Sequence, residues 1–366
     1  MRGQWIGSYG GTNSGLAVLD LDDDGHSLSG IGYVFDDDPQ LVGTAARMSI
    51  PADADRWEGE LNIYPFEASS GVVLSAETLA ATHPDIVHDT RAAVSLRQDG
   101  DVMNFSFETA VSKGNGILQR GHANARSTLP VVEEIQDWAR FRQYVANLER
   151  DRFLFRGQPD QRRLRTSFHR TRRKNLVKYI EQDIPALYVR MCAQLPQRLD
   201  ISNPLELGAL YGLAQHHGYP TPLLDWTYSP YIAAYFAYRN VDWKTAGADA
   251  KVRIFVLDAR SWNQDTIPYD RIHHVRPHFS IIRLLPIGNT RMIPQMAHST
   301  LTNVDAIEYF VSSFEEDDKV YLKAIDLPVA EKPSIMQELE FMGISAGSLF
   351  PGLDGTFEDL KLHYFS

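Results

Sequence analysis

Three segments of the chain place polar side chains beside short apolar runs that are predicted to be strands. In Phe155-Arg156-Gly157-Gln158, an arginine at a strand end could hold a phosphate group with two parallel hydrogen bonds. In Leu224-Asp225-Trp226-Thr227, an acid, an aromatic ring and a hydroxyl group precede the helix start Ser229-Pro230, whose free N–H groups favour an anion. The third segment is Arg291–His298. These residue types suit a ligand that carries phosphate groups.

The first two segments resemble the FRG-domain family, which is named for its Phe-Arg-Gly motif. Phe155-Arg156-Gly157 matches that motif. Gln215–Ala237 matches a longer block, Gln-His-aromatic-Gly-x-Pro-Thr-x-Leu-Leu-Asp-Trp-Thr-x-Ser-Pro followed by Ala-x-x-Phe-Ala. His217 stands where the family usually has tyrosine, so His216 is the histidine that matches.

The resemblance continues beyond this block in the same order. Arg291 and Gln295 fit the third motif, and Leu349–Gly355 fits the family's closing Phe-Pro-x-Leu-Asp-Gly. The resemblance therefore covers residues of about 130–362 and says nothing of residues 1–125.

FRG domains are in turn similar, remotely, to ADP-ribosyltransferases, which split NAD between two facing strand clusters. In that fold, an Arg or His on the first strand binds NAD, a Ser- or Thr-bearing second strand leads into a helix, and a later-strand Glu contacts the nicotinamide ribose. The resemblance implies that Arg156 holds NAD and that Gly157 bonds its carboxamide. The other residues that it implies for NAD binding are Thr221, Trp226, Thr227 and Ser229.

Gln295 falls near the position of that Glu, which is a departure from the pattern because a glutamine is neutral and cannot act as a general base. Cleavage of the nicotinamide–ribose bond creates an oxocarbenium-like centre that a carboxylate would stabilise. Asp225 could supply this carboxylate, whereas Glu308 and Glu338 have the pattern of ordinary helix residues. Gln295 could still orient a ribose hydroxyl group. With Arg156, Asp225 and Gln295, His216 is the fourth residue of the expected catalytic set.

Several of these residues have a structural alternative. Arg156 could tie the strand end to an acidic partner, and Asp225 could cap the turn before Ser229-Pro230. Trp226 is of a type more often found in the core, although it is the best candidate for stacking on a base or nicotinamide. We predict no metal site, because the histidine pair His216-His217 lacks the spacing of a zinc site.

The charge is divided between two regions of the chain. Residues 1–125 hold 18 Asp and Glu against 7 Lys and Arg, whereas residues 126–366 hold 29 of each. Within the second region, residues 150–178 carry 11 Lys and Arg against two Asp. This basic segment could contact a nucleic acid, or its arginines could pair with the acidic N-terminal region.

The two regions also differ in the elements that they predict. Residues 1–125 contain nine candidate strands separated by turn clusters, which predicts an antiparallel β-barrel or sandwich that binds a protein or a small ligand. Residues 126–366 mix helices and strands and are expected to form the ADP-ribosyltransferase-like α/β domain of an α+β protein. The predicted helices include one over about 176–195, one capped by Asn203 and one capped by Ser229. The predicted strands of this region are 152–157, 252–258 and 319–325.

Composition limits the class of protein. The chain has 366 residues, 43% of them apolar and 23% charged, which is typical of a soluble globular protein. It has no apolar run of membrane-spanning length and no secretory leader, and the single cysteine, Cys192, fits a reducing cytoplasm.

Two functions follow as expectations. The first is an ADP-ribosyltransferase that uses NAD as substrate and modifies a nucleic acid or a protein, as a bacterial toxin or antiviral effector. The second is a catalytically inactive module that senses NAD or a nucleotide, or an enzyme that only hydrolyses NAD. A nucleic-acid-binding protein that ignores NAD would instead depend on charges such as Arg162, Arg163, Arg172 and Arg173.

Overall fold

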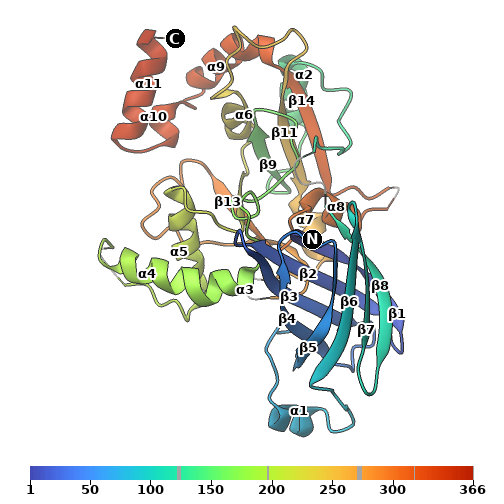
Figure 1. The fold of residues 1–366 in the computed structure, drawn as a ribbon. Helices are drawn as coiled ribbons and strands as arrows, with labels where there is room; N and C mark the ends of the chain where they lie inside the picture. Colours follow the sequence, from blue (N-terminus) through green and yellow to red (C-terminus); the bar gives the residue numbers. More distant parts are fainter. Residues whose placement is uncertain (122–124, 196–197, 270–273, 317, 366) are drawn as a thin grey trace.

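The computed structural model describes residues 1–121, 125–195, 198–269, 274–316 and 318–365. An N-terminal closed β-barrel is followed by a second part built around a six-stranded sheet (Figure 1). The protein is thus of the α+β class, and of the two predicted N-terminal architectures the structure has the barrel. No helix within the described ranges is both long enough and apolar enough to cross a membrane.

Eight antiparallel strands form the barrel, each pairing with the next along the chain and β8 closing on β1. The strands are β1 (Gly3–Gly11), β2 (Gly15–Asp23), β3 (Ser27–Asp36), β4 (Gly43–Pro51), β5 (Arg56–Phe66), β6 (Arg91–Asp99), β7 (Val102–Glu108) and β8 (Lys113–Arg120). The ninth predicted strand, 71–74, is wrong. This segment forms only an isolated bridge, Phe66↔Val73, within the long β5–β6 connection that also carries helix α1 (Ala76–Thr82).

Alternating side chains divide the barrel strands between an interior and an outer face. One end of the interior is filled by large side chains, among them Trp5, whose indole N–H donates to the carbonyl of Met1 at 2.7 Å. The outer faces of β2, β3 and β4 carry a buried apolar cluster that includes Ile31 and Tyr33, and Val177 and Val275 of the second part pack against this cluster. The barrel and the second part therefore share an apolar interface.

The sheet of the second part has the strand order β12-β13-β10-β9-β11-β14, so neighbours in space are distant in sequence. Its strands are β9 (Phe153–Gln158), β10 (Leu223–Thr227), β11 (Lys251–Asp258), β12 (Phe279–Ile282), β13 (Ala297–Thr302) and β14 (Leu322–Pro328). Its helices are α2 (Trp138–Ala146), α3 (Leu176–Lys178), α4 (Ile184–Cys192), α5 (Pro204–His216), α6 (Pro230–Tyr238), α7 (Ala259–Asp265), α8 (Ile307–Ser312), α9 (Lys332–Phe341), α10 (Ala346–Leu349) and α11 (Leu353–Phe365). Helix α6 packs on β9 and β11 through an almost wholly apolar surface.

The predicted caps explain where two of these helices begin. The Asn203 side chain accepts a hydrogen bond from the Leu205 N–H, and Ser229 accepts one from the Ile232 N–H, each followed by proline at the first helical position. The single helix predicted over 176–195 is wrong in detail. A π-helical turn, Tyr179–Asp183, separates α3 from α4 there.

A buried polar cluster joins the two parts. The Gln4 side-chain amide donates to the Asp20 carboxyl group at 2.9 Å and to the Asn303 carbonyl at 2.7 Å, and its oxygen accepts from the Asp305 N–H at 2.7 Å. Nearby, Asp22 accepts hydrogen bonds from the main chain of residues 174 and 175. These bonds satisfy buried polar groups on both sides and so fix the barrel against the sheet.

Candidate functional site

Two central strands of the sheet, β9 and β10, separate at the Phe-Arg-Gly motif. β9 pairs with β11 over its whole length, from Phe153 to Gln158, but its register with β10 is a single pair, Thr227↔Phe155. β9 therefore diverges from β10 directly after Phe155. Arg156 lies at the point of divergence, and Asp225 lies on the facing part of β10.

The Arg156 side chain spans this opening. Its Nη1 donates to the main-chain carbonyl of Asp225 at 2.6 Å, while its Nε is buried and has no hydrogen-bond partner within the described structure. Burial lowers the pKa of Arg156, the nearby charge of Asp225 raises it, and the charge of Arg170 lowers it again. The guanidinium is thus held in place at one nitrogen and keeps a donor for a further acceptor.

Asp225 and Arg291 both lie close enough to His216 for their charges to act on its imidazole. The Asp225 side chain is exposed on an otherwise buried strand. Burial lowers the pKa of His216 at the end of α5, and the positive charge of Arg291 acts in the same direction. A hydrogen bond with Asn289 and the negative charge of Asp225 act against this lowering. The structure therefore brings together Arg156, Asp225 and His216, from three different elements.

Residues 151–245 match the FRG domain family. The matched segment contains β9, α5, β10 and α6, with Arg156, His216 and Asp225 among its residues, and it supports the FRG family for this part of the chain. Arg291 and Gln295 lie beyond its end. No curated protein and no solved structure shows a significant match to the chain.

The glycine of the FRG motif has a packing role. A Cβ atom on Gly157 would lie 1.8 Å from the Ala233 carbonyl oxygen and 2.6 Å from the Ala237 nitrogen, both in the main chain of α6. Such distances are far inside van der Waals contact, so α6 can approach β9 only because residue 157 has no side chain. The predicted bond from Gly157 to a carboxamide stays a prediction.

Trp226, expected to lie in the core or to stack on a base or nicotinamide, lies in the core of the second part. Its side chain is 2% exposed, packs edge-on against Phe279, and donates its indole N–H to Thr300 at 3.0 Å. With its ring covered and its polar atom bonded, Trp226 is closed to a ligand in this structure. Its alternation with Leu224 places both side chains on the same buried face of β10.

The three hydroxyl residues predicted to bind NAD are engaged in local bonds. Buried Thr221 bonds to the Gln215 side chain and, through its N–H, to Ser167. The Thr227 hydroxyl accepts from the Ser229 N–H at 3.0 Å, and Ser229 caps α6. The contacts of Thr227 and Ser229 shape the turn from β10 into α6, and those of Thr221 hold the segment before β10.

Gln295 lies just before β13, whose first residue pairs with Thr227. Its side-chain amide donates to the Leu349 carbonyl at 3.0 Å, and the neighbouring Arg291 guanidinium lies over the Phe350 ring at 5.0 Å. The third motif therefore holds the closing Leu349–Gly355 segment against the sheet. The side chain of Glu338 accepts a hydrogen bond from Trp138 Nε1, as expected for an ordinary helix residue. Glu308 departs from that expectation, because its side chain is buried, accepts from the Leu164 N–H and has a second oxygen with no partner among the described residues.

Much of the basic segment 150–178 is engaged within the protein. Arg152 pairs with Asp258 at 2.6 Å, Arg162 with Asp160 at 3.3 Å, and Arg173 with both Asp22 and Asp183. The pair with Asp22 is the predicted alternative, in which an arginine meets the acidic barrel. Arg170 is the residue of this segment that sequence reasoning missed. Its charge acts on Arg156, but in the sequence it is one basic residue among many.

The donor set of this site suits an anion rather than a metal. Arg156 brings positive charge to the opening, Arg291 acts on the nearby His216, and one Arg156 donor lacks a partner among the described residues. Across the residues that the structure describes, no group of three or more His, Cys, Asp or Glu side chains could hold a metal ion.

Proposed function

We propose that the second part binds NAD at the opening between β9 and β10, cleaves its nicotinamide–ribose bond and transfers ADP-ribose to a macromolecule. The observation that supports this most is the unpartnered, buried Nε of Arg156 at the divergence of the first two strands. A charged donor with spare hydrogen-bonding capacity would hold a pyrophosphate oxygen once NAD displaces the atoms that cover it. Its place on the first strand of this part, before glycine, agrees with the resemblance to ADP-ribosyltransferases.

In this proposal, Arg156 and Asp225 have different roles. The bond from Arg156 Nη1 to the Asp225 carbonyl orients the guanidinium before substrate binds. The exposed Asp225 carboxylate would face the positive charge that develops on the ribose as nicotinamide leaves, and so would stabilise the transition state.

His216 would act as the general base for the macromolecule that accepts ADP-ribose. Its lowered pKa leaves the imidazole mainly neutral at pH 7, the form that can take a proton from an attacking hydroxyl or amine. The basic segment 150–178 makes a nucleic acid a reasonable acceptor, with a protein side chain as the alternative. A toxin or antiviral effector is the biology that we propose for such a transfer, and growth arrest on expression of the active protein would support it.

The test is incubation of the full chain with NAD that carries a label on the adenylate phosphate, with DNA, RNA or a protein mixture as acceptor. Nicotinamide release together with label on an acceptor supports transfer, whereas release without labelled acceptor indicates a hydrolase. The protein would be a sensor if NAD binds without turnover, which the neutral Gln295, with its amide bonded to Leu349, would favour. Asp225→Asn tests the proposed carboxylate, because it keeps the main-chain carbonyl that Arg156 contacts and removes only the charge. It should slow nicotinamide release while NAD still binds.

A further inference from the structure

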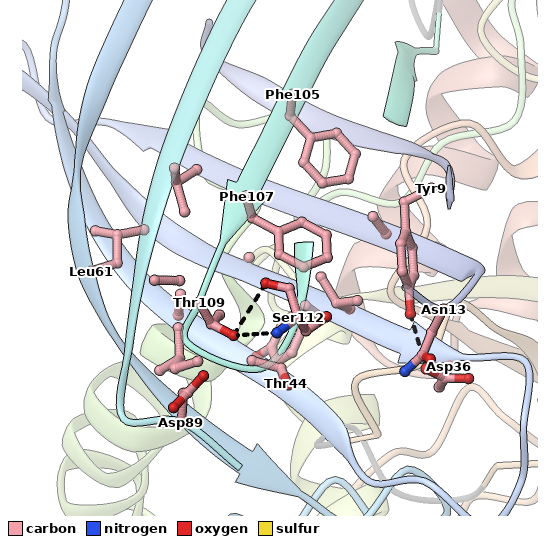
Figure 2. A pocket seen from close by; sticks show the side chains of 18 of the residues that line it. Tyr9, Asn13, Asp36, Thr44, Leu61, Asp89, Phe105, Phe107, Thr109 and Ser112 are labelled. Atoms are coloured by element: carbon pink, nitrogen blue, oxygen red, sulfur yellow. Dashed lines mark hydrogen bonds between the residues drawn. The ribbon is translucent and has the colours of Figure 1, made fainter. Parts of the chain in front are cut away.

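The barrel interior contains a cavity of about 210 Å³, and Trp5 is not among the residues that line it (Figure 2 shows the lining). Its wall is apolar, formed by inward side chains such as Leu61, Val94, Phe105 and Phe107. The two phenylalanine rings lie parallel at 6.4 Å between centroids, and their faces border the space. An apolar wall of this kind offers little to water and favours an apolar occupant.

Small residues keep the space open. Ala17, Gly32 and Ala92 line the cavity where larger side chains could stand. A Cβ on Gly32 would meet Met48 Cε at 3.5 Å and Leu19 Cδ1 at 3.8 Å, which is ordinary van der Waals contact. The strand therefore does not need glycine here for close packing, in contrast to Gly30, whose Cβ would lie 1.8 Å from the Asp20 carbonyl oxygen.

The polar groups of the cavity gather at its other end, near the loops that join the strands (Figure 2). The Tyr9 hydroxyl donates to Asp36 at 3.3 Å, and Thr44 Oγ1 lies 2.9 Å from His88 Nε2. The Asp89 carboxylate accepts from the Val111 N–H at 3.0 Å. Hydroxyl groups of Thr109 and Ser112 stand on the same rim.

The chemistry of this rim selects against an anion. Asp36 and Asp89 both line the cavity, and the barrel region has 18 acidic against 7 basic residues. A carboxylate or phosphate would lose its hydration to meet like charge, whereas an uncharged hydroxyl could donate to a carboxylate and accept from a hydroxyl group. An engineered cavity of about 150 Å³ in another protein holds benzene, so by proportion this one has room for about eight non-hydrogen atoms. The rest of a somewhat larger molecule would lie at the rim, where the cavity is open.

We infer that the barrel is a binding site for a small, flat, apolar molecule with one uncharged hydroxyl group. Its body fills the space between Leu61 and the paired rings of Phe105 and Phe107, and its hydroxyl group meets the polar rim at Asp36 and Thr44. This site is separate from the opening between β9 and β10, and it stands whether or not the second part acts on NAD.

The experiment uses 2-naphthol as the probe and the full chain, with binding measured by calorimetry and by probe fluorescence. We expect saturable binding of one molecule per chain. The anion 2-naphthoate, of nearly the same shape, should bind at least about tenfold more weakly because of the acidic rim. Failure of 2-naphthol to bind, or equal binding of both probes, would overturn the inference.

Two adjacent alanines give a matched pair of variants that locates the probe. Ala92 lines the cavity, whereas Ala93 is exposed on the outer face of the same strand, β6. Ala92→Phe should abolish binding of 2-naphthol, and Ala93→Phe should leave it unchanged. Gly32→Val is the second cavity-filling variant, should Ala92→Phe fail to fold by circular dichroism. Undiminished binding in a folded cavity-filling variant would show that the probe binds elsewhere.

Discussion

The barrel and the sheet of the second part use polar side chains in opposite ways. In the barrel, each strand neighbours the next along the chain. The polar groups that line the cavity lie at one end of it, and the apolar remainder of the interior is partly empty. In the second part, strands distant in sequence meet, and the polar residues of the motifs mainly bond to the main chain around them. The barrel keeps an unfilled volume, whereas the second part keeps donors that have no partner among the described residues, Arg156 Nε being one of them.

This difference bears on how a sequence motif should be interpreted. The FRG segment is highly specific, yet Gly157, Trp226 and Thr221 serve packing and local bonding in the structure. A motif can therefore be conspicuous because it specifies how strands and a helix meet. The residues that keep chemical capacity are a smaller set, centred on Arg156 and Asp225.

The largest expected effect tests whether the two regions are chemically independent. Arg156→Ala removes the proposed pyrophosphate donor and should lower NAD turnover or NAD affinity by up to about 100-fold, since a charged hydrogen bond contributes up to about 3 kcal/mol. Binding of 2-naphthol by the barrel should not change. Loss of both activities together would mean that the variant perturbs the whole fold.

Gly157→Ala should destabilise the second part by about 3 kcal/mol, because its Cβ would collide with the α6 main chain. Denaturant unfolding measures the change. Gly247→Ala is the matched control, since a Cβ there meets no atom within 4 Å, and it should shift the free energy of unfolding by less than about 0.5 kcal/mol. Equal effects of the two substitutions would contradict the packing role of Gly157.

The interface between the regions should respond to pH. Burial raises the pKa of Asp20 to about 8, with the charges of Asp22 and Asp305 adding to this and the Gln4 hydrogen bond and Lys174 opposing it. Because the folded state keeps a proton that the unfolded state loses, the Asp20 contribution to the free energy of unfolding decreases as the pH rises from about 4 to about 8. The slope for one proton is at most about 1.4 kcal/mol per pH unit.

Asp20→Asn should remove this component of the pH dependence, because asparagine stays neutral while its oxygen can still accept from Gln4. Unfolding free energies measured from pH 4 to pH 8 give the comparison. An unchanged slope in the variant would mean that another group titrates.

The smallest effect concerns the empty volume itself. Gly32→Val fills part of the cavity and replaces a strand glycine with a β-branched residue, so it should stabilise the barrel by about 0.5–1 kcal/mol. NAD turnover should not change. Gly30→Val, two residues away on the same strand, should destabilise instead, because its side chain would meet the Asp20 carbonyl. Thermal unfolding distinguishes the two outcomes.

The sequence by itself determined features that depend on near neighbours in the chain. Alternating side chains and turn clusters predicted the barrel strands, and Asn203 and Ser229 marked the helix starts, because a cap and its helix are only a few residues apart. The Phe-Arg-Gly motif and the block after Gln215 predicted a resemblance to the FRG family, which the family match over residues 151–245 supports.

Tertiary structure alone decided what each polar residue does. Whether Trp226 is covered, whether Gly157 faces a helix and whether Gln295 bonds to residue 349 all depend on contacts between distant segments, which no local pattern encodes. The same holds for the barrel cavity, since an unfilled volume arises from the closure of all eight strands around small residues. Burial and free hydrogen-bonding capacity are properties of the assembled fold.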